Sequence, residues 1–91
     1  MATSKINNTP IYKFTKEVTF PKNSRTPVDI TNDIPNRSNM KGYDVGFKYT
    51  DHYYDLVPDT KVVDSARPMF YVRNTNEVYD ITNELQIVVF Y

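Results

Sequence analysis

The chain has 91 residues, with eleven lysines and arginines, eleven aspartates and glutamates, one histidine and no cysteine. This length suits one domain, and the lack of cysteine excludes disulfides, thiolate metal ligands and cysteine nucleophiles. A net charge of zero argues against general nucleic-acid binding, which needs a basic surface. Eight tyrosines and five phenylalanines stand against two glycines, and six prolines divide the chain, so short strands are favoured over long helices.

The N-terminal part of the chain predicts an arm followed by a strand. Residues 1–10 are largely polar, with Ile6 as the one large apolar side chain after Met1, and we expect them to extend as an arm. They lack the apolar stretch of a signal peptide, and no segment suits a membrane span, so no membrane association is expected. Residues 12–20 alternate between apolar and polar. Lys16 interrupts their apolar face, which predicts an edge strand or a bulge.

The middle of the chain predicts two strands separated by polar loops. A turn over 22–26 leads into a short strand over 27–31, and a long polar loop follows over 32–42. The regular alternation of residues 43–50 is typical of a half-buried antiparallel strand. Its inward-facing side chains are Tyr43, Val45, Phe47 and Tyr49. Residues 51–60 predict a loop with aromatic content.

The C-terminal third predicts four further strands, over residues 61–63, 68–73, 77–82 and 85–91. The last of them is apolar on both faces, so a second sheet or a neighbouring molecule must cover it. Taken together, the pattern predicts an all-β fold: a small antiparallel β-sandwich or barrel of six to eight short strands. The expected organisation is an extended arm over residues 1–10 and a single β domain over 11–91.

One phrase occurs twice, as "DITNDI" at residues 29–34 and as "DITNEL" at residues 80–85. In the longer alignment of 20–34 with 71–85, each copy reads as a strand, an asparagine-centred turn and a second strand, since asparagine tolerates positive φ. The inward-facing positions also correspond, with Val28 and Ile30 in the first copy and Tyr79 and Ile81 in the second. Either a duplicated hairpin or convergence on similar turn residues explains the repeat. Both explanations predict that the phrase marks the end of a strand, and neither makes it a ligand motif.

Catalytic and metal-binding chemistry find little support in the sequence. His52, in "TDHYYD", is the only histidine; Asp51 or Asp55 would orient it as a general base, but no serine or threonine nucleophile stands in a recognisable setting. A solvated loop histidine is the simpler interpretation. The aspartates lack calcium-loop spacing, and the two glycines do not form a phosphate-binding loop. We expect no metal, no cofactor and no enzymatic activity.

Two sets of residues are candidates for binding. The apolar C-terminal strand and the polar arm predict partner contacts, because an exposed apolar edge pairs readily with another chain. These partner-binding candidates are Ile6, Ile11, Tyr12, Val88, Phe90 and Tyr91. The alternative is a ligand contact at His52, Tyr53 and Tyr54, since exposed tyrosines stack on a sugar or a partner side chain. If one of these rings caps the core instead, that surface is lost.

The leading "MATSKINNTPIYKF", the compact cysteine-free β body and the bias toward Asn, Lys, Ile and Tyr give the chain a recognisable style. In this it resembles small virion structural proteins of tailed bacteriophages, of the capsid auxiliary or decoration type. The resemblance covers the whole chain but rests on no sequence motif, so no residue role is carried over. It implies a protein that binds the major capsid lattice, often as a trimer, and stabilises the shell.

The expected function is therefore that of a non-enzymatic structural protein of a viral particle, assembled in the host cytoplasm. Its expected partners are other virion proteins, the major capsid protein first among them, with a tail component as a further possibility. It is expected to form a homo-oligomer or to be bound in a lattice, without nucleic acid. The alternative function is a small carbohydrate- or protein-binding module that uses its exposed tyrosines.

Overall fold

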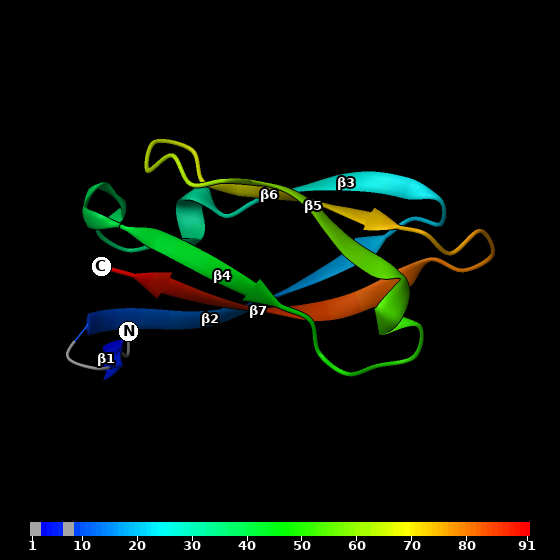
Figure 1. Cartoon of the computed structure of the whole chain (residues 1–91), viewed down its shortest axis with the longest axis horizontal. Coiled ribbons are helices and arrows are strands. Elements are labelled where there is room, and N and C mark those ends of the chain that lie inside the picture. The colour runs from blue at the N-terminus through cyan, green and yellow to red at the C-terminus, as the bar shows by residue number, and fades with distance from the viewer. Residues whose placement is uncertain (1–2, 7–8) are drawn as a thin grey trace.

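The computed structural model describes residues 3–6 and 9–91, which form a small β-sandwich (Figure 1). The strands are β1 (Thr3–Ile6), β2 (Thr9–Phe20), β3 (Ser24–Asp29), β4 (Gly42–Gly46), β5 (Leu56–Val62), β6 (Met69–Asn74) and β7 (Ile81–Phe90). Three short 3₁₀ turns connect them: η1 (Thr31–Asp33), η2 (Arg37–Asn39) and η3 (Tyr53–Asp55). The predicted all-β fold class is confirmed.

All strand pairs in the described residues are antiparallel, and they form two sheets. The first sheet has the order β1-β2-β7-β4, and the second has the order β3-β6-β5. The C-terminal strand β7 therefore lies between two neighbours, and its backbone groups are used on both sides. The expectation that this segment offers a free edge to another chain is wrong, because its own sheet covers both edges.

The core lies between the two sheets and follows the alternation of each strand. In β7 every second residue from Ile81 to Val89 is buried, while Thr82 and Gln86 point to solvent. In β6, Phe70 and Val72 point inward from the other side. The buried cluster consists of Phe20, Val28, Ile30, Ile34, Tyr43, Leu56, Phe70, Val72, Ile81, Leu85, Ile87 and Val89. Burial of these side chains, at about 1.5–3 kcal/mol each, is the main driving force for folding.

The N-terminal segment is extended and folds back on the domain. Thr3–Ile6 forms β1, which pairs with the first residues of β2 as far as the pair Thr3 and Tyr12. The expected boundary between the arm and the β domain, at residue 10, thus falls within strand β2. Beyond Tyr12, β2 pairs with β7 alone, so the stretch that contains Lys16 is a sheet edge, as its interrupted apolar face predicted.

The repeated phrase occupies two related but different places. Each longer copy passes from one sheet to the other, since β2 and β7 belong to the first sheet and β3 and β6 to the second. Neither copy is a hairpin, so the duplicated hairpin, one of the two explanations for the repeat, is wrong. Instead the copies lie side by side, with β2 paired to β7 and β3 paired to β6. The first phrase ends β3, but the second begins β7, so it marks a strand end only once.

Several strand boundaries differ from those predicted. Strand β4 stops at Gly46, four residues before the expected end, and β5 already begins at Leu56 within the expected loop. A bulge between Pro58 and Thr60 interrupts β5. The two strands expected over 77–82 and 85–91 are one continuous strand, preceded by a loop over 75–80.

The sandwich is elongated, with a longest extent of 43 Å. Strand β1 and the C-terminal end of β7 lie at one end, on the left in Figure 1, whereas η3 and the connection that follows β6 lie at the opposite end. None of the helical segments in the described residues has the length and apolar character to cross a membrane.

Candidate functional site

Five aromatic side chains gather at the end of the molecule opposite the termini. Tyr49, His52, Tyr53 and Tyr54 come from the β4–β5 connection, and Tyr79 comes from the β6–β7 connection. We call these five residues the aromatic end. The ring centroids of Tyr49 and Tyr53 are 5.0 Å apart, and His52 stacks on Tyr79 with a centroid distance of 4.9 Å. The rings of Tyr53 and Tyr54 are nearly perpendicular, with their centroids 5.9 Å apart.

Three of the five rings of the aromatic end are open to solvent, and His52 and Tyr53 are half-buried. Tyr49 is 85% exposed, Tyr54 is 68% exposed and Tyr79 is 54% exposed, and the neighbouring Val78 is 67% exposed. Single exposed apolar residues are ordinary on protein surfaces, but a contiguous group of large aromatic rings is typical of a binding surface. The aromatic end is therefore the candidate site.

Asp55 holds the two connections of the aromatic end together. Its backbone carbonyl accepts hydrogen bonds from the Thr75 amide at 2.9 Å and the Thr75 hydroxyl at 3.0 Å. Its carboxylate accepts a hydrogen bond from Nδ2 of Asn76 at 3.0 Å and lies 3.8 Å from Nδ1 of His52. Asp55 in the β4–β5 connection thus binds Thr75 and Asn76, the first two residues of the β6–β7 connection.

Local turns position the individual rings. His52 adopts a left-handed backbone conformation with φ 62°, and its carbonyl accepts the Asp55 amide hydrogen at 2.9 Å, which closes the turn of η3. In the other connection, Oδ1 of Asn76 accepts the amide hydrogens of Val78 and Tyr79, both at 2.8 Å. Because asparagine side chains readily mimic a backbone turn, this connection presents Tyr79 in a defined position.

A buried asparagine on β7 determines where the first connection begins. Asn83 is 1% exposed, and its Oδ1 accepts the Lys48 amide hydrogen at 3.0 Å while its Nδ2 donates to the Lys48 carbonyl at 2.8 Å. The side chain replaces the backbone partner that β4 would otherwise find on β7. The chain therefore leaves the sheet after Gly46. Tyr49 points to solvent, whereas the sequence pattern predicted that it points into the core.

The two connections carry an excess of negative charge. Residues 47–55 and 75–80 contain four carboxylates against one lysine, Lys48, and no arginine. The carboxylates are Asp51, Asp55, Glu77 and Asp80. Three of them are exposed, and Asp55 is half-buried by its contacts with Asn76 and Thr75. The surface around the rings is thus acidic although the whole chain is neutral.

The predicted partner-binding residues do not form one exposed surface. Ile11 is 1% exposed, so its own chain and not a partner covers it. Tyr12 and Tyr91 are half-buried and pack against the core cluster, and the Tyr91 hydroxyl donates to the Pro35 carbonyl. Val88 and Phe90 are half-buried on the outward face of β7, and the side chain of Ile6 lies outside the described residues.

The predicted alternative set is brought together by the fold. His52, Tyr53 and Tyr54 lie within one η3 turn and its cap, and the structure adds Tyr49 and Tyr79 to them. Sequence reasoning missed these two tyrosines because it assigned both to the inward face of a strand. The polar stretch Asn74–Glu77 directly before Val78 and Tyr79 was the signal against that assignment.

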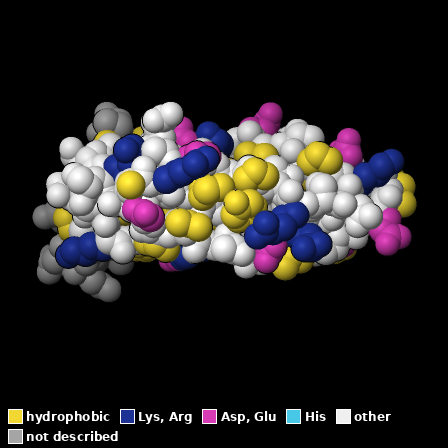
Figure 2. All heavy atoms as spheres, turned by 90° about the horizontal axis from the view of Figure 1, so that it is seen from above, with side chains coloured by type: hydrophobic (Ala, Val, Ile, Leu, Met, Phe, Trp, Pro, Cys, Tyr) yellow, Lys and Arg dark blue, Asp and Glu magenta, His cyan; other side chains and the backbone are white. Residues whose placement is uncertain are grey.

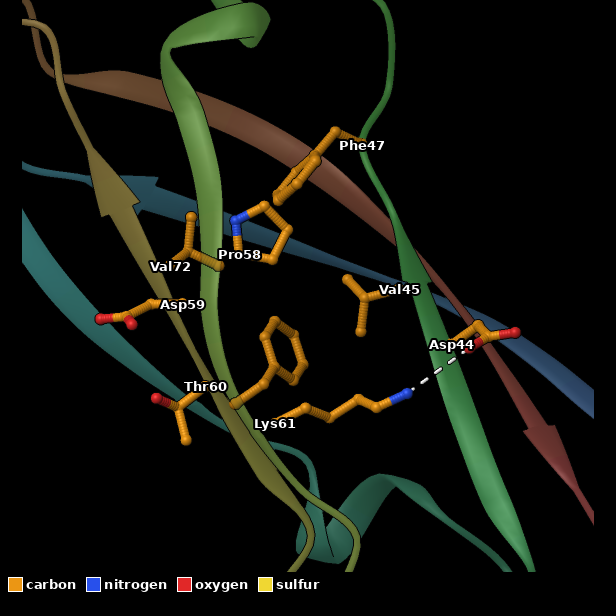
Figure 3. Close-up of a pocket in the computed structure, with 9 residues that line it drawn as sticks. Asp44, Val45, Phe47, Pro58, Asp59, Thr60, Lys61 and Val72 are labelled. Atoms are coloured by element: carbon orange, nitrogen blue, oxygen red, sulfur yellow. Dashed lines mark hydrogen bonds and ion pairs between the residues drawn. The ribbon is translucent and has the colours of Figure 1, made fainter.

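A groove between the edge strands β4 and β5 is the second candidate (Figure 3). Its volume is about 250 Å³, and its lining comprises Asp44, Val45, Phe47, Pro58, Asp59, Thr60, Lys61, Phe70 and Val72. Lys61 crosses its mouth, where Nζ donates to the Tyr43 carbonyl at 2.7 Å and approaches Asp44 at 3.5 Å. The Lys61 ammonium is engaged by these partners.

The outward face of the three-stranded sheet carries a smaller apolar patch. Figure 2 shows hydrophobic side chains near the middle of this face with lysine and arginine beside them. Tyr71 points outward from β6 in this sheet, and the Arg25 guanidinium carbon lies 3.9 Å above its ring. Arg25 also donates to the Asp59 carboxylate, and this hydrogen bond lowers the pKa of Asp59. The patch is thus partly covered by the chain itself.

Metal binding and comparisons with known proteins add no further assignment. In the part of the chain that the structure describes, no group of three His, Asp or Glu side chains is arranged to hold a metal ion. A comparison of the chain with protein-family models, curated proteins and solved structures finds no match. The functional argument therefore rests on the aromatic end and its surroundings.

Proposed function

We propose that this protein is a non-enzymatic structural component of a viral particle and that it binds a neighbouring protein through the aromatic end. The observation that carries the proposal is the combination of exposure and order at this end. Tyr49, Tyr54 and Tyr79 are more than half exposed, yet Asp55, Asn76 and Asn83 hold the connections that bear them.

That combination favours a binding role over an incidental surface feature. Tyrosine supplies a large amphipathic contact at low conformational cost, and it is enriched among the residues that dominate protein interfaces. Hydrogen bonds that already order the two connections reduce the entropy lost on association. A partner at this end would bury the rings, and the opposite end, with β1, would stay available for a second contact.

The viral context rests on the resemblance to small virion proteins of tailed bacteriophages. On that basis the partner is another virion protein, and the major capsid protein is the first to test, with a tail component next. The protein would occupy the particle as a homo-oligomer or in a repeated lattice position, after assembly in the host cytoplasm. Neither nucleic acid nor a membrane has a part in this proposal.

Co-sedimentation with shells of the major capsid protein encoded in the same genome tests the proposal. The unmodified protein is expected to sediment with the shells, and the double variant Tyr54→Ala, Tyr79→Ala is expected to stay in the supernatant. The matched control is Gln86→Ala on the outward face of β7, outside the two connections that form the aromatic end, which should sediment normally. Failure of the unmodified protein to join shells or complete particles would refute the proposed function.

A carbohydrate ligand is the second candidate, favoured by the open ring faces of Tyr49 and Tyr54. Aromatic faces of this kind also stack against the apolar face of a sugar ring. A glycan array separates the two: binding that disappears in Tyr54→Ala, from a protein that ignores shells and particles, would replace the structural function by a carbohydrate-binding one.

A further inference from the structure

We infer that the aromatic end recognises arginine side chains on its protein partner, with guanidinium groups stacked on the tyrosine rings and paired with the surrounding carboxylates. The inference rests on the proposed function and names the chemistry of the partner. It follows from three features of the described residues: the open ring faces, the acidic surroundings and an arrangement of the same kind elsewhere in this chain.

The rings offer faces on which a planar cation stacks. Tyr49 and Tyr54 are the most exposed rings, at 85% and 68%, and neither carries a cation from its own chain among the described contacts. A cation over a tyrosine face is attracted by the ring quadrupole, and arginine does this more often than lysine because its guanidinium is flat. An open pair of tyrosines therefore suits arginine well.

The local charge selects a cation over an anion or a neutral ligand. One lysine against four carboxylates leaves residues 47–55 and 75–80 with a net charge of −3. Lys22, whose amide donates to the Asp80 carboxylate at 2.9 Å, reduces this to −2 when it is included. A surface that is negative around its contact residues accelerates the approach of a basic partner and disfavours an acidic one.

The chain itself shows how such a contact is built. On the outward face of the three-stranded sheet, the Arg25 guanidinium lies 3.9 Å above the Tyr71 ring, donates to the Asp59 carboxylate and reaches the Thr60 hydroxyl at 3.3 Å. There the guanidinium stacks on a tyrosine ring and pairs with a carboxylate at the same time. The aromatic end has the tyrosines and the carboxylates, and its two connections contain no arginine, so the partner would supply it.

A peptide titration followed by ¹⁵N–¹H NMR tests the inference with the full chain. The probe is a short peptide in which arginine and glycine alternate, and its reference replaces every arginine by citrulline, which keeps the shape and removes the charge. The arginine peptide is expected to shift the amide signals of residues 47–55 and 75–80, and added salt should weaken the effect. The citrulline peptide should cause no shifts there.

Two sets of variants separate the contribution of the tyrosine rings from that of the carboxylates. Tyr54→Ala with Tyr79→Ala is expected to weaken peptide binding about tenfold, whereas Tyr54→Phe, which retains the ring, should bind normally. Asp51→Asn with Glu77→Gln should weaken binding and reduce its salt dependence. The matched control is Glu17→Gln on the outward face of β2, which should have no effect. Amide signals of residues that the peptide does not affect should keep their positions in each variant, which confirms that the variant is folded.

Several results would overturn the inference. Equal binding of the citrulline peptide would exclude charge recognition, and shifts confined to the sheet faces would exclude this site. A methylated sugar that shifts residues 47–55 when the arginine peptide does not would assign the rings to carbohydrate. The proposed function fails separately: peptide binding without shell binding would refute the capsid role, and shell binding lost in the tyrosine variant without peptide binding would refute the arginine chemistry alone.

Discussion

Two buried asparagines determine where the chain leaves its sheets. Asn83 binds the backbone of Lys48 through both its oxygen and its nitrogen. Asn74 is fully buried and donates from Nδ2 to the carbonyls of Phe20 and Tyr79, at 3.0 and 3.1 Å. It thereby joins two of the four places at which the chain crosses between the sheets, β2 to β3 and β6 to β7. Burial of an amide is unfavourable unless its groups are paired, and here each pairing also shapes a loop.

Removal of the Asn83 side chain should destabilise the fold and loosen the aromatic end. In Asn83→Ala the Lys48 amide and carbonyl lose their partner, and we expect a loss of about 2–3 kcal/mol in the free energy of unfolding. Urea denaturation measures this loss, and hydrogen exchange should show faster exchange of the Lys48 amide. The control Gln86→Ala, on the exposed face of the same strand, should change stability by less than about 0.5 kcal/mol. Slow Lys48 exchange in Asn83→Ala would contradict this role.

At the residue scale, sequence alternation identified the core better than the surface. It placed Val28, Ile30 and Tyr43 inward, and all three are buried. It also placed Tyr49 and Tyr79 inward, although both are exposed. The alternation continues through these tyrosines, so the pattern alone predicts burial. The cause of their exposure lies in Asn83 and Asn76, whose hydrogen bonds to the backbone are long-range or turn-specific and leave no periodic signal.

At the scale of the elements, several sheet edges carry features that hinder pairing with another chain. Strand β3 contains Pro27 and strand β5 contains Pro58, and proline offers no amide hydrogen to an incoming strand. Lys16 points inward from the free part of β2, where its Nζ lies 2.9 Å from the Asp33 carboxylate. On the edge strand β5, the Lys61 ammonium reaches across the groove and donates to the Tyr43 carbonyl of β4. Inward-pointing charges on edge strands oppose edge-to-edge association, so contacts with partners are better sought on loops.

Tyr43 connects the two sheets, since its strand β4 belongs to the first sheet and its hydroxyl reaches the second. The hydroxyl oxygen lies 2.8 Å from the carbonyls of Val62 and Met69, near the end of β5 and the start of β6. The residue is 1% exposed, and this burial raises the pKa of Tyr43 to about 12. Ionisation of Tyr43 would therefore destabilise the closed sandwich.

Stability should fall at alkaline pH because of this tyrosine. The unfolded chain releases the Tyr43 proton near pH 10 and the folded chain near pH 12, so the contribution is complete below pH 10 and is lost as the pH rises to 12. The difference corresponds to about 2–3 kcal/mol. Tyr43→Phe should show a flatter decline of the unfolding free energy, measured by urea denaturation between these pH values. Tyr54→Phe, at an exposed ring, should decline like the unmodified protein, and an unchanged slope in Tyr43→Phe would contradict this explanation.

The connections between the elements were less predictable than the strands themselves. Strand-forming residues and prolines indicated an all-β fold, and the structure confirms it. A duplicated hairpin was one of two explanations for the repeated phrase, but the short turn with Asn23 at φ 49° carries the chain from one sheet to the other. Turn residues show where a chain changes direction. Whether the next strand pairs with its predecessor or with a distant strand depends on which faces must be buried together, and this is a property of the whole core.

At the scale of the whole molecule, the sandwich separates two ends. One end holds β1 and the C-terminal end of β7, and the other holds the aromatic end (Figure 1). The net charge of the chain is zero, but the carboxylates near the aromatic end outnumber the cations there. Composition therefore concealed a local acidic surface that becomes apparent only once the two connections are brought together. His52, Tyr53 and Tyr54 were identifiable from the sequence as a candidate contact, whereas their grouping with Tyr79 required the fold.

Hydroxyl-radical footprinting of the particle tests the central claim most directly, because it compares the same side chains in the free and the assembled protein. The account predicts that Tyr49, Tyr54 and Tyr79 are oxidised several-fold more slowly in the particle than in solution. Tyr71, on the outward face of the three-stranded sheet, provides the internal reference and should react at the same rate in both. Equal oxidation of the three tyrosines in the particle and in solution would contradict the claim that the aromatic end is the contact surface.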